Sequence, residues 1–369
     1  MKNIYVTQPY LPDLGAFSAL LEEIWASRRL TNNGPLHEQL EREVAEYLGV
    51  EHLSLFSNGT IALMTALRAL DLRGEVITTP FSFVATTHAI AWNGLRPVFS
   101  DIEAETFNLD PARLEAAITP ETCAIMPVHC YGTPCEVEAI GEIAARHGLR
   151  GIYDAAHAFG VRDAGGSVLR HGDLAVLSFH ATKVFSTLEG GAIIAPDAET
   201  KRRIDRLKNF GIVNEVEVDG IGLNGKMNEV QAAFGLLQLR AVDAALAERA
   251  RVAARYRAAV ADIPGLTCLP AQIAAHENNA YFPVLVGPAY PLGRDALYEA
   301  LRARGIYARR YFYPLISSIP AYRDLPSARA GNLPVANRIG AQVLCLPIYP
   351  DLTDGDVDRI LDAIRAAGT

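Results

Sequence analysis

The sequence predicts an α/β protein with a large domain built on a mostly parallel β-sheet, followed by a smaller α+β domain. Short apolar runs alternate with amphipathic helical segments through the first half of the chain, which is typical of a parallel sheet covered by helices on both faces. One long helical stretch at 226–261 follows, and the pattern changes after Pro264-Gly265. We therefore expect a large domain at 1–245 and a small domain at 246–369.

The individual elements follow from these patterns in chain order. Residues 1–16 contain Pro9 and Pro12 and favour an extended arm that packs outside the large domain. Apolar residues at helical spacing predict helices at 36–48, which Gly49 ends, and from Thr60 onward. The strands expected in the large domain are 76–79, 97–100, 124–128, 151–153, 174–179 and 191–195, with helices at 86–92, 112–118 and 137–147. In the small domain we expect strands at 280–286, 306–311 and 343–348, and helices at 294–304 and 353–366.

Composition and charge argue against several classes of function. The 369 residues carry a net charge of −8 and no long basic cluster, so nucleic acid is not expected as a partner. The N-terminus shows no signal-peptide pattern, and no apolar run approaches a membrane span. We therefore expect a cytoplasmic protein without a membrane partner. Cys130 and Cys135 are not at zinc-ligand spacing, so the five cysteines are expected as reduced thiols, with no metal site.

A lysine and an aspartate near the ends of predicted strands give the strongest chemical signal. Lys183 lies in the loop after strand 174–179, and Asp154 follows strand 151–153. Ligands of such sheets bind beyond the carboxyl ends of the strands. A lysine amine can bond covalently to a carbonyl carbon, and a carboxylate can hold a pyridine nitrogen protonated. Taken alone, Lys183 would be interpreted as a solvated loop lysine and Asp154 as a cap. Together they predict a site for pyridoxal 5'-phosphate (PLP).

Neighbouring segments supply further candidates for that site. Gly59 and Thr60 open a predicted helix, where free amides and the helix dipole attract a phosphate, although an ordinary N-cap is the alternative. Ser178 ends the strand that leads to Lys183. Phe83 has an aromatic ring that can stack on a flat cofactor, although core packing is the usual role of a single Phe.

Two histidines lie close to the pair in sequence. His180 precedes Lys183 by three residues and can assist proton transfer or contact the substrate, but a satisfied loop histidine is an equal alternative. His157 follows Asp154 by three residues and can donate a hydrogen bond to the cofactor's phenolic oxygen.

Polar segments later in the chain are candidates for binding anions. Asn224 and Lys226 lie in the turn that enters the long helix, where either can reach an anion or simply cap the helix. Arg309 and Tyr311 lie in a predicted strand of the small domain. They can face a carboxylate or phosphate, and a solvated strand is the alternative.

Five of these segments together resemble one known family. SNGTIAL, TPFSFVAT, YDAAHAFG, SFHATKVFSTLEGG and GLNGKMNE stand in the order found in the DegT-type sugar-nucleotide aminotransferases. The likeness runs from TQPYLP near the N-terminus to LCLPIYP near the C-terminus. It implies a PLP enzyme of fold type I, the aspartate-aminotransferase fold.

The resemblance implies a role for each candidate residue. Lys183 would bond to the cofactor and later act as acid and base, Asp154 would pair with the pyridinium nitrogen, and Phe83 would stack on the ring. Many relatives carry Gln where this chain has His157. The phosphate contacts would be Gly59, Thr60, Ser178 and, from the neighbouring subunit, Asn224, so the active unit would be a homodimer with shared sites. Lys226 stands where some relatives have Arg.

The flanking motifs narrow the expected substrate. TQPYLP, LTNNGP, VHCYG and RRYFYPLIS most resemble the subgroup that aminates C4 of dTDP-4-keto-6-deoxyglucose, with glutamate as amino donor, for polysaccharide or O-antigen biosynthesis. Three alternatives remain: a 3-keto sugar nucleotide as substrate, a dehydratase of the same fold, and a non-catalytic regulator. Dehydratases carry His in place of the cofactor-bonding lysine, so Lys183 argues against the second.

Overall fold

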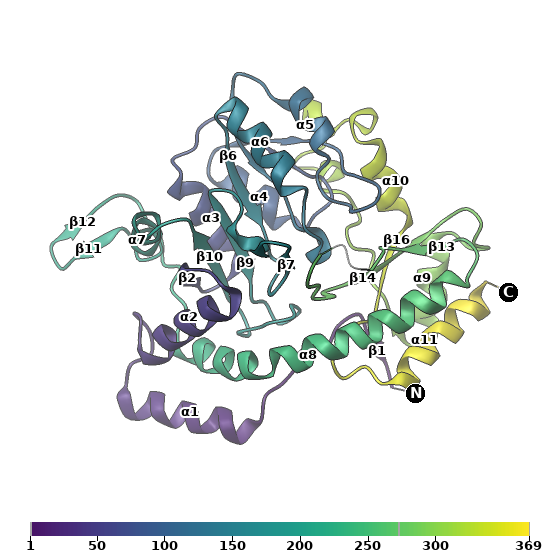
Figure 1. Ribbon diagram of the computed structural model, residues 1–369, viewed down its shortest axis with the longest axis horizontal. Helices are drawn as coiled ribbons and strands as arrows, with labels where there is room; N and C mark the ends of the chain where they lie inside the picture. Colours follow the sequence, from purple (N-terminus) through teal and green to yellow (C-terminus); the bar gives the residue numbers. More distant parts are fainter. Residues whose placement is uncertain (1, 272–273, 369) are drawn as a thin grey trace.

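The computed structural model describes residues 2–271 and 274–368, and a seven-stranded sheet forms its centre (Figure 1). The strand order is β2-β10-β9-β6-β5-β3-β4, and all neighbours pair in parallel except those of β10, which is antiparallel to both β2 and β9. The prediction of a mostly parallel sheet is confirmed. The strands are β2 (His52–Phe56), β3 (Glu75–Thr78), β4 (Arg96–Phe99), β5 (Thr122–Met126), β6 (Arg150–Asp154), β9 (Leu174–Ser178) and β10 (Gly191–Ala195).

Helices cover both faces of this sheet because successive strand residues point to opposite sides. In β9, for example, Ala175 and Leu177 belong to one buried cluster, whereas Leu174 and Val176 belong to another. The first cluster packs against α2 (Pro35–Leu48), α6 (Val137–His147) and α8 (Glu229–Ala261). The second packs against α3 (Gly59–Ala69), α4 (Ala85–Trp92) and α7 (Ala198–Leu207). Helix α5 (Pro111–Ala117) packs beside α6. A further buried cluster joins the segments after β3, β4 and β5 to the C-terminal part of the chain.

The long helix α8 (Glu229–Ala261) links the sheet to the C-terminal part of the chain (Figure 1). It begins with a capping box formed by Asn228 and Gln231. The prediction that no apolar run approaches a membrane span was wrong for this helix, since an 18-residue window reaches a mean hydropathy of 1.2. Half of that window is buried inside the protein (50%), so packing against the core accounts for its apolar composition.

The C-terminal part contains a second, antiparallel sheet in the order β13-β14-β16. Its own buried cluster joins this sheet to the second half of α8. The predicted strand at 306–311 was too long, because only its first two residues form β15. The elements of the C-terminal part are β13 (Leu266–Cys268), β14 (Phe282–Val286), β15 (Ile306–Tyr307), β16 (Val343–Leu346), α9 (Arg294–Ala303), α10 (Pro334–Gln342) and α11 (Asp354–Ala367).

The N-terminal segment differs from the expected arm. Strand β1 (Ile4–Tyr5) pairs in parallel with β15, so the chain start packs on the C-terminal part. Helix α1 (Leu14–Ser27) begins before the expected end of the arm at residue 16, because Asp13 caps it by accepting a hydrogen bond from Ala16 N at 2.8 Å. Met1 of the arm and Thr369 of the predicted small domain lie outside the described residues.

Two hairpins were not predicted. One is formed by β7 (Arg162–Asp163) and β8 (Gly166–Ser167), and the other by β11 (Ile212–Asn214) and β12 (Glu217–Val218). The β11–β12 hairpin projects from the body of the molecule beside α7 (Figure 1). With the adjoining loop it exposes the large apolar side chains of Phe210, Ile212, Val216, Val218 and Ile221, between the exposed polar residues Asn214, Glu215, Glu217 and Asp219.

Candidate active site

A cavity of about 740 Å³ lies at the carboxyl ends of β6 and β9, between the large sheet and the C-terminal part. Its lining comes from the start of α3, the ends of β6 and β9, the loop after β9 and the segment after β15. The sequence-predicted residues that line it are Gly59, Thr60, Phe83, Asp154, His157, Ser178, His180, Lys183, Arg309 and Tyr311. The fold therefore brings together ten residues that lie far apart in sequence.

Lys183 and Asp154 form the buried base of this cavity. Burial lowers the pKa of the Lys183 amine to about 8, although the negative charge of Asp154 opposes that shift. Burial also raises the pKa of Asp154. The Asp154 carboxylate remains well supplied with donors, since it accepts hydrogen bonds from the Thr86 hydroxyl at 2.7 Å and from Ala156 N at 3.1 Å. The lysine is thus easily deprotonated, and the carboxylate is held in one orientation.

The start of α3 forms a narrow cradle next to Ser178. Asn58 caps the helix by accepting a hydrogen bond from Ile61 N at 2.9 Å. Gly59 follows, and a Cβ atom there would come within 2.9 Å of the Ser178 Cβ. The exposed Thr60 also faces the cavity. Bare backbone, a hydroxyl on each side and the positive end of a helix dipole make this corner suitable for a phosphate.

Phe83 and His157 present flat rings to the cavity. Phe83 is 57% exposed in the single chain, which is unusual for a core aromatic. His157 is buried, and its ring lies parallel to that of Phe312 at 5.8 Å. Its Nδ1 accepts a hydrogen bond from Tyr131 N at 3.1 Å. Burial and the charge of Lys183 keep the His157 pKa well below its usual value. A neutral ring with Nδ1 occupied carries its proton on Nε2, so His157 is a hydrogen-bond donor.

His180 lies near the mouth of the cavity and faces a carboxylate that sequence reasoning missed. Its Nδ1 accepts a hydrogen bond from Thr182 N at 3.2 Å, and its Nε2 lies 3.5 Å from Glu189 Oε1. Glu189 also lines the cavity. One signal in the sequence could have indicated it, because Glu189 ends the same loop that carries His180 and Lys183.

Three other lining or supporting residues were missed. Thr86 supports Asp154 from α4, and Phe312 stacks on His157. Tyr281 packs its ring edge against His157 at 4.9 Å and lies 5.9 Å from Lys183 Nζ. Each lies on a separate segment of the chain from the residue it contacts, so no local pattern in the sequence connects them.

Arg309 reaches the cavity from the C-terminal part. Its backbone pairs with Cys345 through two hydrogen bonds of 3.1 and 2.7 Å, which fixes the segment after β15. Its exposed guanidinium lies 5.7 Å from the ring of Tyr311. This places a cation and an aromatic ring at the side of the cavity opposite the large sheet.

Asn224 and Lys226 do not line the cavity of their own chain. Asn224 is exposed and bridges to Asn209, and the Lys226 amine donates to the Asn209 side chain at 2.6 Å. Both residues lie near the base of the β11–β12 hairpin. Within a single chain, neither contacts the groups that surround Lys183.

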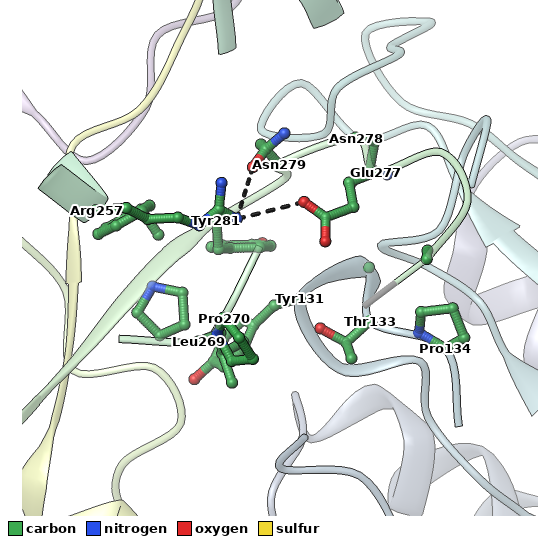
Figure 2. Close-up of a pocket in the computed structure, with 14 residues that line it drawn as sticks. Tyr131, Thr133, Pro134, Arg257, Leu269, Pro270, Glu277, Asn278, Asn279 and Tyr281 are labelled. Carbon is green, nitrogen blue, oxygen red and sulfur yellow. Dashed lines mark hydrogen bonds and ion pairs between the residues drawn. The ribbon is translucent and has the colours of Figure 1, made fainter. Parts of the chain in front are cut away.

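A second, much smaller pocket of about 40 Å³ lies on the other side of Tyr281, which lines both (Figure 2). There the Arg257 guanidinium lies 3.3 Å from both Glu277 and Asn279. These contacts hold the polypeptide that leads into β14. Tyr281 thus separates the two pockets, and Arg257 secures the segment that precedes it.

Residues 15–365 match the DegT/DnrJ/EryC1/StrS aminotransferase family. The chain belongs to this family. It is 53% identical over 362 residues to the dTDP-4-amino-4,6-dideoxy-D-glucose transaminase of Escherichia coli, with 97% of each chain covered. It is 34% identical to the dTDP-3-amino-3,4,6-trideoxy-alpha-D-glucose transaminase of Micromonospora megalomicea, covering 94% of this chain and 92% of the relative.

The fold comparison agrees with the sequence comparison. The structure of DesI in the presence of its TDP-sugar product superposes with a TM-score of 0.95 at 37% identity, covering 100% of this chain and 94% of that one. The protein is therefore an enzyme, a sugar aminotransferase with the expected fold. The predicted family and reaction class are confirmed.

Aminotransferases of this family use PLP, and the cavity residues fit it. The corner at Gly59 and Ser178 leaves room for a phosphate because a side chain at position 59 would fill it. Asp154 is an ionisable acceptor positioned by two donors, as a pyridinium nitrogen requires. Lys183 has a depressed pKa, which a covalent bond to a carbonyl carbon requires. The phosphate, the ring nitrogen and the aldehyde of PLP thus each have a group in the cavity that can bind them.

Proposed function

We propose that this enzyme transfers the amino group of L-glutamate to C4 of dTDP-4-keto-6-deoxy-D-glucose and forms dTDP-4-amino-4,6-dideoxy-D-glucose. The observation that carries the proposal is the full-length identity of 53% to a relative with that product name, together with the Lys183–Asp154 cavity. A relative named for C3 amination shares only 34%. Amination at C3 is therefore the weaker alternative.

The residues around the cavity have different roles in the reaction. PLP, when bound, stabilises negative charge at the carbon next to the transferred nitrogen. Lys183 has a pKa of about 8, so its amine can both accept and return a proton near neutral pH. Asp154 would hold positive charge on the ring nitrogen of the bound cofactor, and the Thr86 hydrogen bond keeps that carboxylate oriented. His157 would donate a hydrogen bond to the cofactor through its Nε2–H.

Both substrates use the same cavity in turn, so both need a cation there. L-Glutamate carries two carboxylates, and the sugar nucleotide carries a diphosphate. The overall charge of the protein cannot attract these anions, because the chain is acidic with a net charge of −8. Arg309 faces the cavity and is our candidate for these anions, with Tyr311 beside it. Lys226 is a second candidate, from a neighbouring subunit.

The active unit is a homodimer in this proposal. Asn224 and Lys226 lie outside the cavity of their own chain, and the hairpin next to them exposes an apolar surface. Burying that hairpin against a second copy would remove exposed apolar area from water. The same contact would carry Asn224 to the phosphate corner of the partner.

Two further statements complete the proposal. The enzyme works in the cytoplasm, without a membrane partner, and supplies an aminosugar nucleotide for polysaccharide or O-antigen assembly. The division into a large domain at 1–245 and a small domain at 246–369 stays a prediction. It is supported by separate buried clusters under the two sheets.

A substrate panel tests the proposal. The enzyme would be incubated with L-glutamate and each of several 3-keto and 4-keto sugar nucleotides, and the aminated carbon assigned by NMR. We expect turnover with dTDP-4-keto-6-deoxy-D-glucose and nitrogen on C4. Nitrogen on C3, or turnover only with another nucleotide carrier, would refute the substrate while leaving the aminotransferase family intact.

A further inference from the structure

The geometry points to Glu189 as the residue that recognises a hydroxyl group of the sugar ring. The inference rests on the proposed function, because it concerns how that substrate is held. Among the described residues that line the cavity, the acidic ones are Asp154 and Glu189. Asp154 is buried and already accepts two hydrogen bonds. Glu189 has a side chain that is 58% exposed at the mouth.

The backbone around Glu189 is held firmly, which fixes the point from which its side chain reaches the mouth of the cavity. The Glu189 carbonyl accepts hydrogen bonds from the Thr187 hydroxyl at 2.8 Å and from Gln231 Nε2, which belongs to the capping box of α8. Leu188 has a φ of 69°, a left-handed conformation that a leucine rarely adopts. Gly190 is required next, because a Cβ there would lie 1.9 Å from the Thr187 Oγ1. A strained turn held by two donors at a cavity mouth indicates a functional position.

His180 positions the same carboxylate from the other side. Thr182 N donates to its Nδ1 at 3.2 Å, which turns Nε2 toward Glu189 Oε1 at 3.5 Å. The structure therefore gives His180 a positioning role through Glu189, in addition to any contact with substrate.

The negative charge of Glu189 determines which kind of partner it can bind. An ionised carboxylate is an acceptor only, so its partner must be a donor such as a hydroxyl group. Sugar rings supply hydroxyls next to the reacting carbon, whereas L-glutamate carries no hydroxyl group. Glu189 therefore acts on the sugar, in the second half of the reaction.

Binding measurements separate this role from a structural one. Glu189→Gln keeps the shape and removes the charge, and Glu142→Gln on the exposed face of α6 is the matched control. Without glutamate the keto-sugar nucleotide is not turned over, so its Kd can be measured by calorimetry beside that of dTDP alone. We expect Glu189→Gln to weaken sugar-nucleotide binding about 5- to 10-fold, the difference between a hydrogen bond to a charged acceptor and one to the neutral amide oxygen that remains. The Kd of dTDP alone should stay within about twofold.

An analogue lacking a hydroxyl next to the keto carbon completes the cycle. Wild-type binding should weaken by at least this factor when the analogue replaces the sugar nucleotide, and the binding of Glu189→Gln should weaken less than that of wild type. The half-reaction with L-glutamate, followed by the absorbance of the bound cofactor, should be no slower in the variant. Equal losses for dTDP and the sugar nucleotide, or full discrimination retained by the variant, would overturn the inference. If wild type binds and aminates no dTDP-keto-sugar, the proposed function has failed instead.

Discussion

The hydroxyl of Thr86 gives the sharpest test of how the site controls Asp154. It donates to Asp154 Oδ2 at 2.7 Å and also contacts the Ser82 hydroxyl at 2.9 Å. Thr86→Val keeps the shape of the side chain and removes that donor. A hydrogen bond to a charged group contributes about 1.5–3 kcal/mol, which corresponds to a loss of roughly 10- to 150-fold in kcat/KM if the bond matters most in the transition state.

The pH profile should shift in a definite direction. The Thr86 hydrogen bond lowers the pKa of Asp154, while burial raises it. Removing the donor therefore raises that pKa, so the ionised carboxylate is lost at a higher pH than in wild type. We expect the acidic limb of the kcat/KM profile to move upward in Thr86→Val, and PLP to dissociate faster during dialysis.

Thr87→Val is the matched control for this experiment. Thr87 is the next residue of the same helix, is equally buried, and its hydroxyl has no hydrogen-bond partner in the part of the chain that the structure describes. Its replacement should leave kcat/KM and the pH profile unchanged and cost no stability, because no hydrogen bond is lost. Equal effects of the two substitutions, or an unshifted acidic limb in Thr86→Val, would refute the reasoning.

Two further predictions follow from other parts of the molecule. If active sites are shared between subunits, mixing inactive Lys183→Ala with inactive Asn224→Ala should restore part of the activity after subunit exchange, and no rescue would contradict sharing. His37 is buried with both ring nitrogens lacking a partner among the described residues, and burial lowers its pKa to about 4 from 6.5. Because only the unfolded chain takes up a proton between these values, the free energy of unfolding should fall by up to about 3 kcal/mol as pH drops from 6.5 to 4. In denaturant titrations, the free energy of unfolding of His37→Leu should not show this part of the decrease. A pH dependence equal to that of wild type would contradict the prediction.

Residues at strand ends could be placed from sequence because the geometry of a parallel sheet is regular. Asp154 and Ser178 end their strands in the structure, and Lys183 follows in the next loop. Once the runs are read as parallel strands, their carboxyl ends must share one edge. This regularity explains why the base of the cavity could be predicted while its walls could not.

Long-range contacts between irregular segments could not be predicted in this way. Strand β1 has only two residues and pairs with β15 near the other end of the chain, so it is too short to produce a periodic pattern. Arg309 was assigned to a strand that in fact ends at Tyr307, yet it still reaches the cavity. Glu189 stood inside a recognised segment, but its role depends on the Leu188 conformation and the Gln231 contact, which only the folded chain shows.

Covalent trapping of the cofactor tests the central assignment most directly. The enzyme loaded with PLP would be reduced with borohydride, digested and mapped by mass spectrometry. The account predicts a pyridoxyl group on Lys183, loss of the label in Lys183→Arg because a guanidinium stays protonated, and an unchanged label in Lys226→Arg. A pyridoxyl group on Lys226 or any other lysine, or protein that binds no PLP, would contradict the assignment of this cavity as the active site.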